Sequence, residues 1–177
     1  MIDSSANSTS RNGGWQQSKR EQVLTKHVVS RWYRAPEIIL LDKHYGTPID
    51  VWAIGGIMAE LLNMMKEHVE NFQDRKPFFP GQSCFPLSPC KSKKQAASSG
   101  FPTDASDQLN MIFEVIGTPQ PSDLAHISDK RVLYYLQSFA SKPKKDLKTA
   151  FPAAPDEALD LLSKMVIFNP HQRITLE

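Results

Sequence analysis

The longest apolar run of the chain, Ile49 to Met65, constrains its fold most strongly. Twelve of these 17 positions are apolar, two are glycine, and three are polar: Asp50, Glu60 and Asn63. A helix needs about 20 residues with few charges to cross a bilayer, so this run is too short and too polar for a membrane span. A helix that is apolar on nearly all sides runs through the middle of a domain instead. We therefore expect a buried central helix over residues 48–65, with Thr47 as its N-cap and Pro48 at its first position.

Size and charge bound the classes of protein that fit this helix. The chain has 177 residues, of which 40% are hydrophobic, which suffices for one domain with a core. Its formal net charge of +2 does not indicate a nucleic-acid partner. Residues 1–14 contain no apolar stretch of the kind found in signal peptides. Cys84 and Cys90 lack metal-ligand spacing and are expected to be free thiols. We expect a cytoplasmic or nuclear protein that binds no metal and has no membrane partner.

The remaining pattern is mainly helical. Residues 107–116, 129–138 and 156–167 carry apolar side chains at helical spacing, and Ser106 or Asp107 is the expected cap of the first of these segments. Residues 1–24 are polar and are predicted to be disordered. Residues 82–106 are rich in Pro, Ser and Lys and are predicted to form a long surface loop. No strand pattern or internal repeat is sustained, so the expected fold class is mainly α.

Four short motifs carry a resemblance to a known family. The sequence RWYRAPE occupies residues 31–37, and Asp50-Val51-Trp52 follows it. Phe168-Asn169-Pro170 and Arg173-Ile174-Thr175 lie near the end of the chain. In this order and spacing the motifs resemble the large, C-terminal lobe of a eukaryotic protein kinase and, more narrowly, of a MAP kinase. The resemblance implies a partial kinase domain over residues 25–177, with 1–24 as an activation-segment insertion.

Three charged residues of the chain match residues that have structural roles in that family. Ala35-Pro36-Glu37 matches the end of the kinase activation segment, where the glutamate pairs with a distant arginine. Arg173 matches that arginine, and a bidentate pair would offset the cost of burying the Glu37 carboxylate. Asp50 matches an aspartate that braces the catalytic loop. The alternative readings are a solvated Glu37 and an Asp50 favoured only by the helix dipole.

The resemblance also implies a regulatory site. Thr25-Lys26-His27 stands where MAP kinases carry the doubly phosphorylated Thr-x-Tyr, so Thr25 is a candidate phosphoacceptor. Thr-x-His resembles the unusual MAP kinases of protozoan parasites. His27 cannot replace the tyrosine, and Arg31 and Arg34, which receive phosphotyrosine in the family, would lose that partner. An ordinary loop threonine and a structural histidine are the alternatives.

Other segments match the substrate side of the family's large lobe. Ser30 matches a hydroxyl residue beside the catalytic machinery, and the segment around Ser30, Arg31 and Arg34 shapes the pocket after the phosphoacceptor. A preference for Ser/Thr-Pro substrates is implied. Trp32 and Tyr33 could equally be core aromatic residues. The segment 118–155 resembles the MAP kinase insert, and 82–106, with Ser88-Pro89 and three lysines, is a variable loop after the family's F-P-G turn at 79–81.

The residues that perform phosphoryl transfer are not found in these 177 positions. The sequence contains no G-x-G-x-x-G, V-A-I-K, H-R-D or D-F-G motif. ATP and Mg²⁺ are implied for a complete domain, but without these motifs no catalytic residue can be named here. We expect this chain alone to bind neither and to be inactive.

Two functions follow as expectations. In the first, the chain is a truncated or misassembled version of a MAP kinase-like Ser/Thr kinase, with protein substrates and an upstream activating kinase as partners. In the second, it is a non-catalytic binding module or decoy derived from a kinase. A generic helical domain that only mimics the motifs is disfavoured by the order and spacing of RWYRAPE, Glu37 and Arg173.

Overall fold

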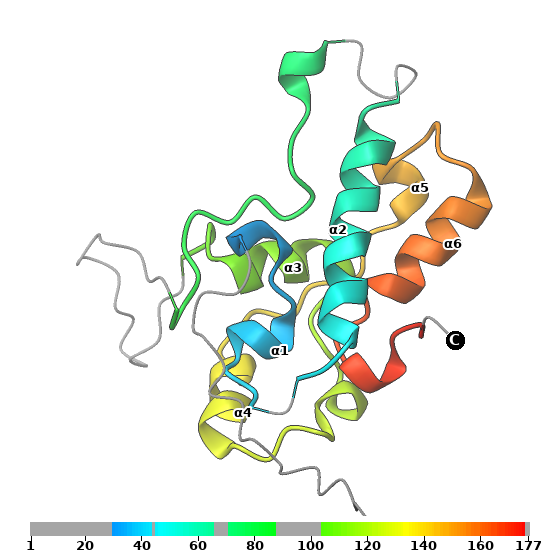
Figure 1. Ribbon diagram of the computed structural model, residues 1–177. Helices are drawn as coiled ribbons and strands as arrows, with labels where there is room; N and C mark the ends of the chain where they lie inside the picture. Colours follow the sequence, from blue (N-terminus) through cyan, green and yellow to red (C-terminus); the bar gives the residue numbers. More distant parts are fainter. Residues whose placement is uncertain (1–29, 44, 66–70, 88–103, 176–177) are drawn as a thin grey trace, which may run out of the picture.

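A computed structural model describes residues 30–43, 45–65, 71–87 and 104–175 (Figure 1). Six α-helices and four short 3-10 helices form the described part, which contains no β-strand beyond an isolated parallel bridge between Ser83 and Asp107. In chain order the elements are η1 (Arg31–Tyr33), α1 (Pro36–Ile39), α2 (Pro48–Asn63), η2 (Phe72–Asp74), α3 (Gln108–Ile116), η3 (Pro121–Leu124), α4 (Lys130–Gln137), α5 (Leu147–Ala150), α6 (Asp156–Met165) and η4 (Pro170–Gln172). The mainly α fold class predicted from the sequence is confirmed.

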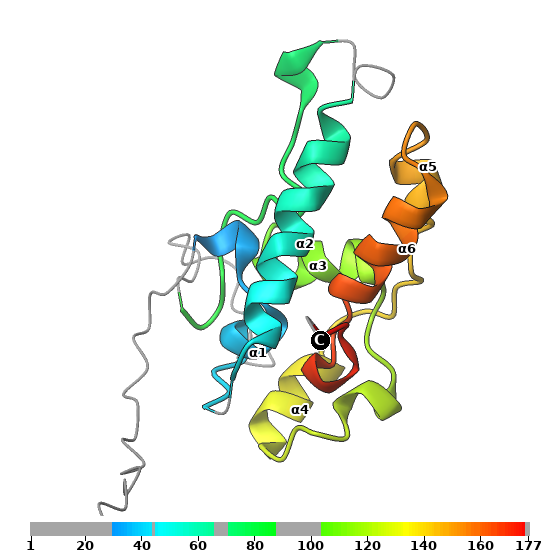
Figure 2. The same cartoon turned by 45° about the vertical axis from the view of Figure 1, so that its right-hand side comes forward.

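The helix α2 is the axis of the fold. Figures 1 and 2 show α6 running beside it, with α3 crossing the core next to both helices. A methyl group added at Gly55 would lie 3.0 Å from Met165 Cβ and 3.0 Å from Val166 Cγ1, so α2 and α6 are in close contact at this glycine. The small residue lets the two backbones approach, which fixes α6 against the central helix.

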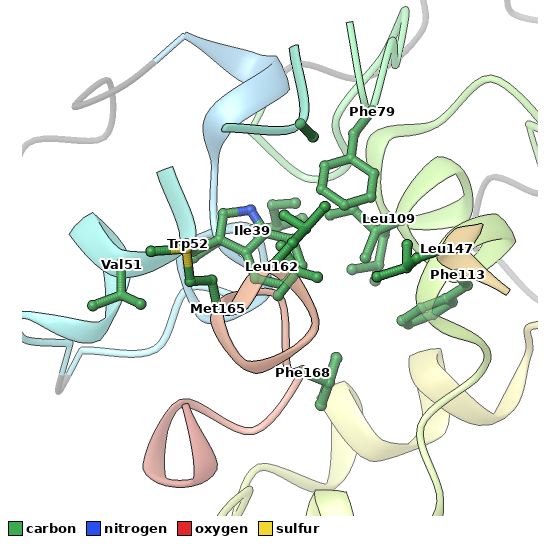
Figure 3. Packing of buried hydrophobic residues seen from close by; sticks show 14 of the residues in the cluster. Ile39, Val51, Trp52, Phe79, Leu109, Phe113, Leu147, Leu162, Met165 and Phe168 are labelled. Atoms are coloured by element: carbon green, nitrogen blue, oxygen red, sulfur yellow. The ribbon is translucent and has the colours of Figure 1, made fainter. Parts of the chain in front are cut away.

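The core gathers around Trp52 (Figure 3). Trp52 is fully buried, and its ring stacks on Phe79 with centroids 5.4 Å apart. Ile39, Leu162 and Met165 lie around it in the close-up view. One cluster of buried side chains therefore joins α1, α2, α6 and the segment that carries Phe79.

The helix ends follow the local sequence closely. Asp107 caps α3 by accepting a hydrogen bond from the Leu109 backbone N–H at 3.2 Å, and Gly117 ends this helix with a φ of 81°. Thr47 stands at the N-cap of α2 but makes no side-chain capping bond there. A methyl at Gly117 would meet the Lys144 backbone nitrogen at 2.9 Å, so both the conformation and the space require glycine.

One expectation about α2 is wrong in part. The helix buries Val51, Trp52, Gly55, Gly56 and Ala59, but its other side is not covered by the described part of the chain. The exposed apolar face of α2, as we call it, consists of Ile54, Ile57, Leu61 and Met64, whose exposed fractions are 43%, 51%, 60% and 52%. Its spacing of three, four and three residues is that of one helical stripe. No described helix is long and apolar enough to cross a membrane.

Candidate functional site

A bidentate ion pair joins the start of the described chain to its end. Arg173 donates from Nη1 to Glu37 Oε1 and from Nη2 to Glu37 Oε2, each at 2.6 Å. The two side chains are 0% and 3% exposed. The pair spans 136 residues of sequence, so it fixes α1 relative to the C-terminal turn η4.

All the remaining donors of the Arg173 guanidinium are also used. Nη1 donates to the Pro48 carbonyl at 2.9 Å, Nη2 to the Phe168 carbonyl at 3.1 Å, and Nε to the Ile167 carbonyl at 2.7 Å. The guanidinium carbon also lies 5.0 Å from the centroid of the Trp52 ring. Since an arginine has five N–H donors, none is left unsatisfied, which is what makes a buried charge tolerable.

Local sequence places both members of this pair. Pro36 occupies the first position of α1, so Glu37 lies in the first turn, where the helix dipole favours a carboxylate. Asn169 caps η4 by accepting from the His171 backbone N–H at 3.0 Å, and Arg173 follows this turn directly. Asp50 lies exposed in the first turn of α2, where no described contact distinguishes a bracing residue from a helix-dipole aspartate.

The turn η1 carries the residues expected near a substrate. Arg31 Nη1 donates to the Gln82 carbonyl at 2.6 Å and lies 3.4 Å from the Gly81 carbonyl. Trp32 Nε1 donates to the same Gly81 oxygen at 3.0 Å. The turn is therefore attached to the loop after the F-P-G sequence, while Ser30 just before it is exposed.

The residue after η1, Arg34, lies in a buried polar cluster. Its side chain is 7% exposed and forms a hydrogen bond to the Cys84 thiol. Burial raises the pKa of Cys84, and the hydrogen bond and charge of Arg34 offset this only in part. Burial, followed by the negative charge of Asp107, also raises the pKa of Tyr135. Cys84 is thus a buried free thiol that stays protonated at neutral pH.

The base of the 82–106 loop is pinned to the start of α3. Gln82 N–H donates to the Ser106 carbonyl, and Gln108 N–H donates to the Ser83 carbonyl, both at 2.8 Å. The buried Asp107 carboxylate accepts from Ser83 Oγ at 3.1 Å and from the Phe85 backbone N–H at 2.8 Å. The two ends of the loop therefore meet.

The sequence identified Asp107 as a possible helix cap but not as the residue that closes this loop. Burial raises the pKa of its carboxyl group, although three hydrogen bonds to the carboxylate lower it. The only local signal was a capping aspartate at the end of a polar segment. The contacts to Ser83 and Phe85 cross 24 and 22 residues, and no local pattern predicts them.

Two of the expected sites lie outside the described residues. These are the candidate phosphoacceptor Thr25 with its neighbour His27, and the Ser88-Pro89 dipeptide with its following lysines. The expectation that 1–24 are disordered also concerns residues outside the described part.

The described residues do not fit ATP or Mg²⁺. Among them there is no cluster of three or more His, Cys, Asp or Glu that would hold a metal ion. A cavity of about 330 Å³ lies between the end of α3, residues 142–147 and the end of α6, and its lining includes Val115, Val166 and Phe168. No glycine-rich turn that could hold phosphates lines it, so no step of phosphoryl transfer can be derived from these residues.

The ion pair, the central helix and the order of the motifs define the class as a protein kinase, represented by its helical lobe. Residues 13–177 match the family model of the protein kinase domain. Among curated relatives, the mitogen-activated protein kinase mpk-1 of Caenorhabditis elegans is 38% identical over 161 residues, which cover 91% of this chain and 29% of that protein. Mitogen-activated protein kinase 3 of Oryza sativa subsp. japonica is 38% identical over 90% of this chain and 34% of the relative. Mitogen-activated protein kinase PMK1 of Pyricularia oryzae is 37% identical over 91% of this chain and 36% of the relative.

The chain belongs to the protein kinase family, as a member of its MAP kinase group. It spans about a third of the length of the curated relatives it matches.

Proposed function

We propose that this chain is part of a MAP kinase-like protein Ser/Thr kinase that transfers the γ-phosphate of ATP to Ser/Thr-Pro sites in intracellular signalling. The observation that supports the proposal most is the buried pair of Glu37 with Arg173, formed inside a chain that matches the kinase family model over residues 13–177. Ser30, Arg31 and Arg34 are the proposed substrate-side residues, and Thr25 is the proposed phosphorylation site. Glu37, Arg173 and Asp50 have structural roles in this proposal.

The 177 residues are proposed to be inactive by themselves. Phosphoryl transfer depends on a phosphate cradle, a lysine, metal-binding Asp and Asn residues and a catalytic aspartate, and the sequence contains none of the motifs that carry them. ATP and Mg²⁺ belong to the complete domain in this proposal. The proposed partners are protein substrates and an upstream activating kinase, in the cytoplasm or nucleus.

A second candidate function rests on the exposed apolar face of α2. A kinase-derived module without catalysis could use such a surface to bind another protein, and four large apolar side chains exposed by 43–60% are consistent with that role. This module would compete with an active kinase for shared partners.

One experiment separates the two functions. The endogenous protein is isolated by an antibody against residues 107–125, its intact mass is measured, and its peptides are mapped by mass spectrometry. The same sample is incubated with ATP, Mg²⁺ and a Ser-Pro peptide, with the matching Ser-Ala peptide and the recombinant 177-residue chain as controls. The proposed kinase has peptides with H-R-D and D-F-G motifs and phosphorylates the Ser-Pro peptide preferentially. A 20.0 kDa protein without activity would instead identify the binding module.

A further inference from the structure

The turn η1 is held by two carbonyl oxygens whose position depends on another residue. The Gly81 carbonyl accepts from the Trp32 indole at 3.0 Å, and the Gln82 carbonyl accepts from Arg31 at 2.6 Å. Both acceptors belong to backbone outside any helix, where the local backbone bond runs from the Gly81 N–H to the Phe79 carbonyl at 2.9 Å. Whatever fixes residues 81 and 82 therefore also fixes the Arg31 and Trp32 side chains of η1. Tyr33 is held separately on α2, where its hydroxyl donates to Glu60 Oε1 at 2.9 Å.

The start of α3 supplies this support. Residues 82 and 83 are tied to 106 and 108 by two backbone hydrogen bonds of 2.8 Å. Gly81 also packs directly on the first turn of α3, because a methyl group added there would lie 2.7 Å from Gln108 Cα. The backbone of 81–83 is thus pressed against α3 on one side and accepts the side chains of η1 on the other.

Asp107 is the side chain that holds this arrangement together. It is 1% exposed, and its carboxylate accepts three hydrogen bonds: from Ser83 Oγ, from the Phe85 backbone N–H and from the Leu109 backbone N–H. One of these bonds caps α3, and the other two reach across the loop. A charged acceptor makes stronger hydrogen bonds than a neutral one. The two cross-loop bonds therefore add a link to residues 83 and 85 that helix capping alone would not provide.

We propose that Asp107 is a positioning residue: it fixes the Gly81 and Gln82 carbonyl oxygens and, through them, the Arg31–Tyr33 turn that borders the substrate. The substrate part of this inference rests on the proposed kinase function, whereas the positioning of η1 does not. Asp107 itself touches neither substrate nor nucleotide in this proposal.

The substitution Asp107→Asn isolates the positioning role from the capping role. Asparagine caps helices as well as aspartate does, so its amide oxygen can still accept from Leu109. Its NH₂ group, however, presents donors where the carboxylate accepted from Ser83 and Phe85. Asp129→Asn is the matched control, because Asp129 caps α4 through the Arg131 backbone N–H and lies on the surface.

The first readout is the indole N–H signal of Trp32 in a ¹H–¹⁵N spectrum of the 177-residue chain, assigned with Trp32→Phe. We expect Asp107→Asn to shift this signal and to accelerate its exchange with solvent about tenfold, and Asp129→Asn to change neither. Ser83→Ala, which removes one cross-loop bond, is expected to act in the same direction more weakly and serves if Asp107→Asn does not fold. An unchanged Trp32 signal in the folded variants would overturn the inference.

The second readout is kinetic and uses the protein at its native length. Asp107→Asn is expected to raise the KM for the Ser-Pro peptide about tenfold, while kcat and the KM for ATP stay within about twofold of the unsubstituted enzyme. A kinase whose peptide KM is unchanged overturns the substrate part of the inference, even if the Trp32 signal shifts. A shifted Trp32 signal in a protein without kinase activity overturns the proposed function but supports the positioning of η1.

Discussion

The two sides of the apolar helix α2 differ in how far the rest of the described chain buries them. On one side, Trp52 packs on Phe79 and under the Arg173 guanidinium, and Gly55 admits α6 to close contact. On the other side, Ile57 and Leu61 are more than half exposed. The same sequence run is thus a core on one side and an uncovered surface on the other. The difference teaches that apolar composition determines what a helix can bury, while its neighbours determine what it does bury.

The largest expected effect on stability comes from breaking the buried ion pair of Glu37 with Arg173, which we call the anchor. Arg173→Ala leaves the Glu37 carboxylate buried without a partner and removes the donors of three carbonyl groups. We expect a loss of about 3–5 kcal/mol in the free energy of unfolding. Because a domain of this kind has only about 5–15 kcal/mol in total, this loss removes a large part of its stability.

Urea denaturation followed by circular dichroism measures this loss. The control is Arg131→Ala, which breaks a pair with Asp129 whose side chains are 90% and 45% exposed. That control is expected to keep the denaturation midpoint of the original chain. Equal midpoints for Arg173→Ala and Arg131→Ala would show that the buried pair does not anchor the fold.

The second prediction tests how tightly the buried side is packed. The Cβ of Gly55→Ala would lie 3.0 Å from atoms of Met165 and Val166, so these side chains must shift by a few tenths of an ångström. We expect a net loss of about 1–2 kcal/mol, since overpacking outweighs the helix propensity gained by alanine. Gly56→Ala is the matched control, because its Cβ meets only the edge of the Tyr33 ring at 3.2 Å. Equal thermal midpoints for the two variants would contradict a tight α2–α6 contact.

Local patterns predicted the helices well, because the determinants of a helix lie within it. The helix α3 covers the predicted segment 107–116 except for its first residue, and both the Asp107 cap and the Gly117 end are local signals. Segments 129–138 and 156–167 are likewise close to α4 and α6. The contact of Glu37 with Arg173 was anticipated only through the family resemblance, since 136 residues separate them.

Tertiary arrangement was beyond local patterns. The acceptors of Arg31 lie 50 and 51 residues away, at the end of the F-P-G turn and just after it, and no local pattern predicts that contact. Tyr135 is buried on α4, whereas helical spacing predicts Val132, Leu133 and Leu136 as the inward residues, of which Leu136 is buried and the other two are only half-buried. The position of the exposed apolar face on α2 was not predicted for the same reason: a hydrophobic count does not reveal which side of a helix has a neighbour.

The third prediction concerns pH near the anchor. Burial, followed by the charge of His171, lowers the pKa of His126 below its usual 6.5, while the Asp123 backbone and the charges of Asp42 and Glu37 act in the opposite direction. The unfolded chain therefore binds this proton more readily than the folded chain, and stability falls as pH drops below about 6.5. One such group changes stability by at most about 1.4 kcal/mol per pH unit.

Urea denaturation at pH 7.5, 6.5 and 5.5 tests the role of His126. His126→Gln is expected to flatten the loss between pH 6.5 and 5.5 relative to the unsubstituted chain. His171→Gln, which removes the neighbouring charge but keeps the burial of His126, is expected to reduce the loss without abolishing it. An acid-induced loss that is identical in all three chains would rule out this titration as its source.

The fourth prediction concerns an exposed leucine inside the anchored region. Leu41 follows α1 with a φ of 61°, a left-handed conformation that costs a leucine about 1–2 kcal/mol. Its N–H donates to the Ile38 carbonyl and the Asp42 N–H to the Glu37 carbonyl, the pattern in which Gly or Asn usually ends a helix. Leu41→Asn is expected to stabilise the chain by about 0.5 kcal/mol.

Met64→Asn is the matched control for Leu41→Asn in thermal denaturation. Met64 is 52% exposed and Leu41 50%, and both follow a helix, but Met64 has a right-handed φ of −81°. Asparagine is therefore expected to give no stabilisation at 64. A similar gain at both positions would mean that the removal of an exposed apolar side chain, and not relief of backbone strain, causes the effect.

The smallest effect on stability is expected on the uncovered side of α2, where the comparison is tested most directly. Ile57→Lys with Leu61→Lys replaces two side chains that are 51% and 60% exposed. Because these side chains lose little burial, the free energy of unfolding should change by no more than about 0.5 kcal/mol. Val51→Lys, at a position of the same helix that is 2% exposed, should unfold the chain, because it buries an unpaired charge.

The same double variant should change association strongly. A contiguous apolar stripe promotes contacts between molecules, and two added charges oppose them. We therefore expect light scattering of the unsubstituted chain to rise with protein concentration, and that of the double lysine variant to stay at the value of a 20.0 kDa monomer. If the double variant instead loses its helical circular dichroism as Val51→Lys does, this side of α2 is packed in solution and the two faces do not differ. A folded variant that associates as strongly as the original chain would show that another surface causes the association. This outcome would not bear on the prediction for the pair of Glu37 with Arg173.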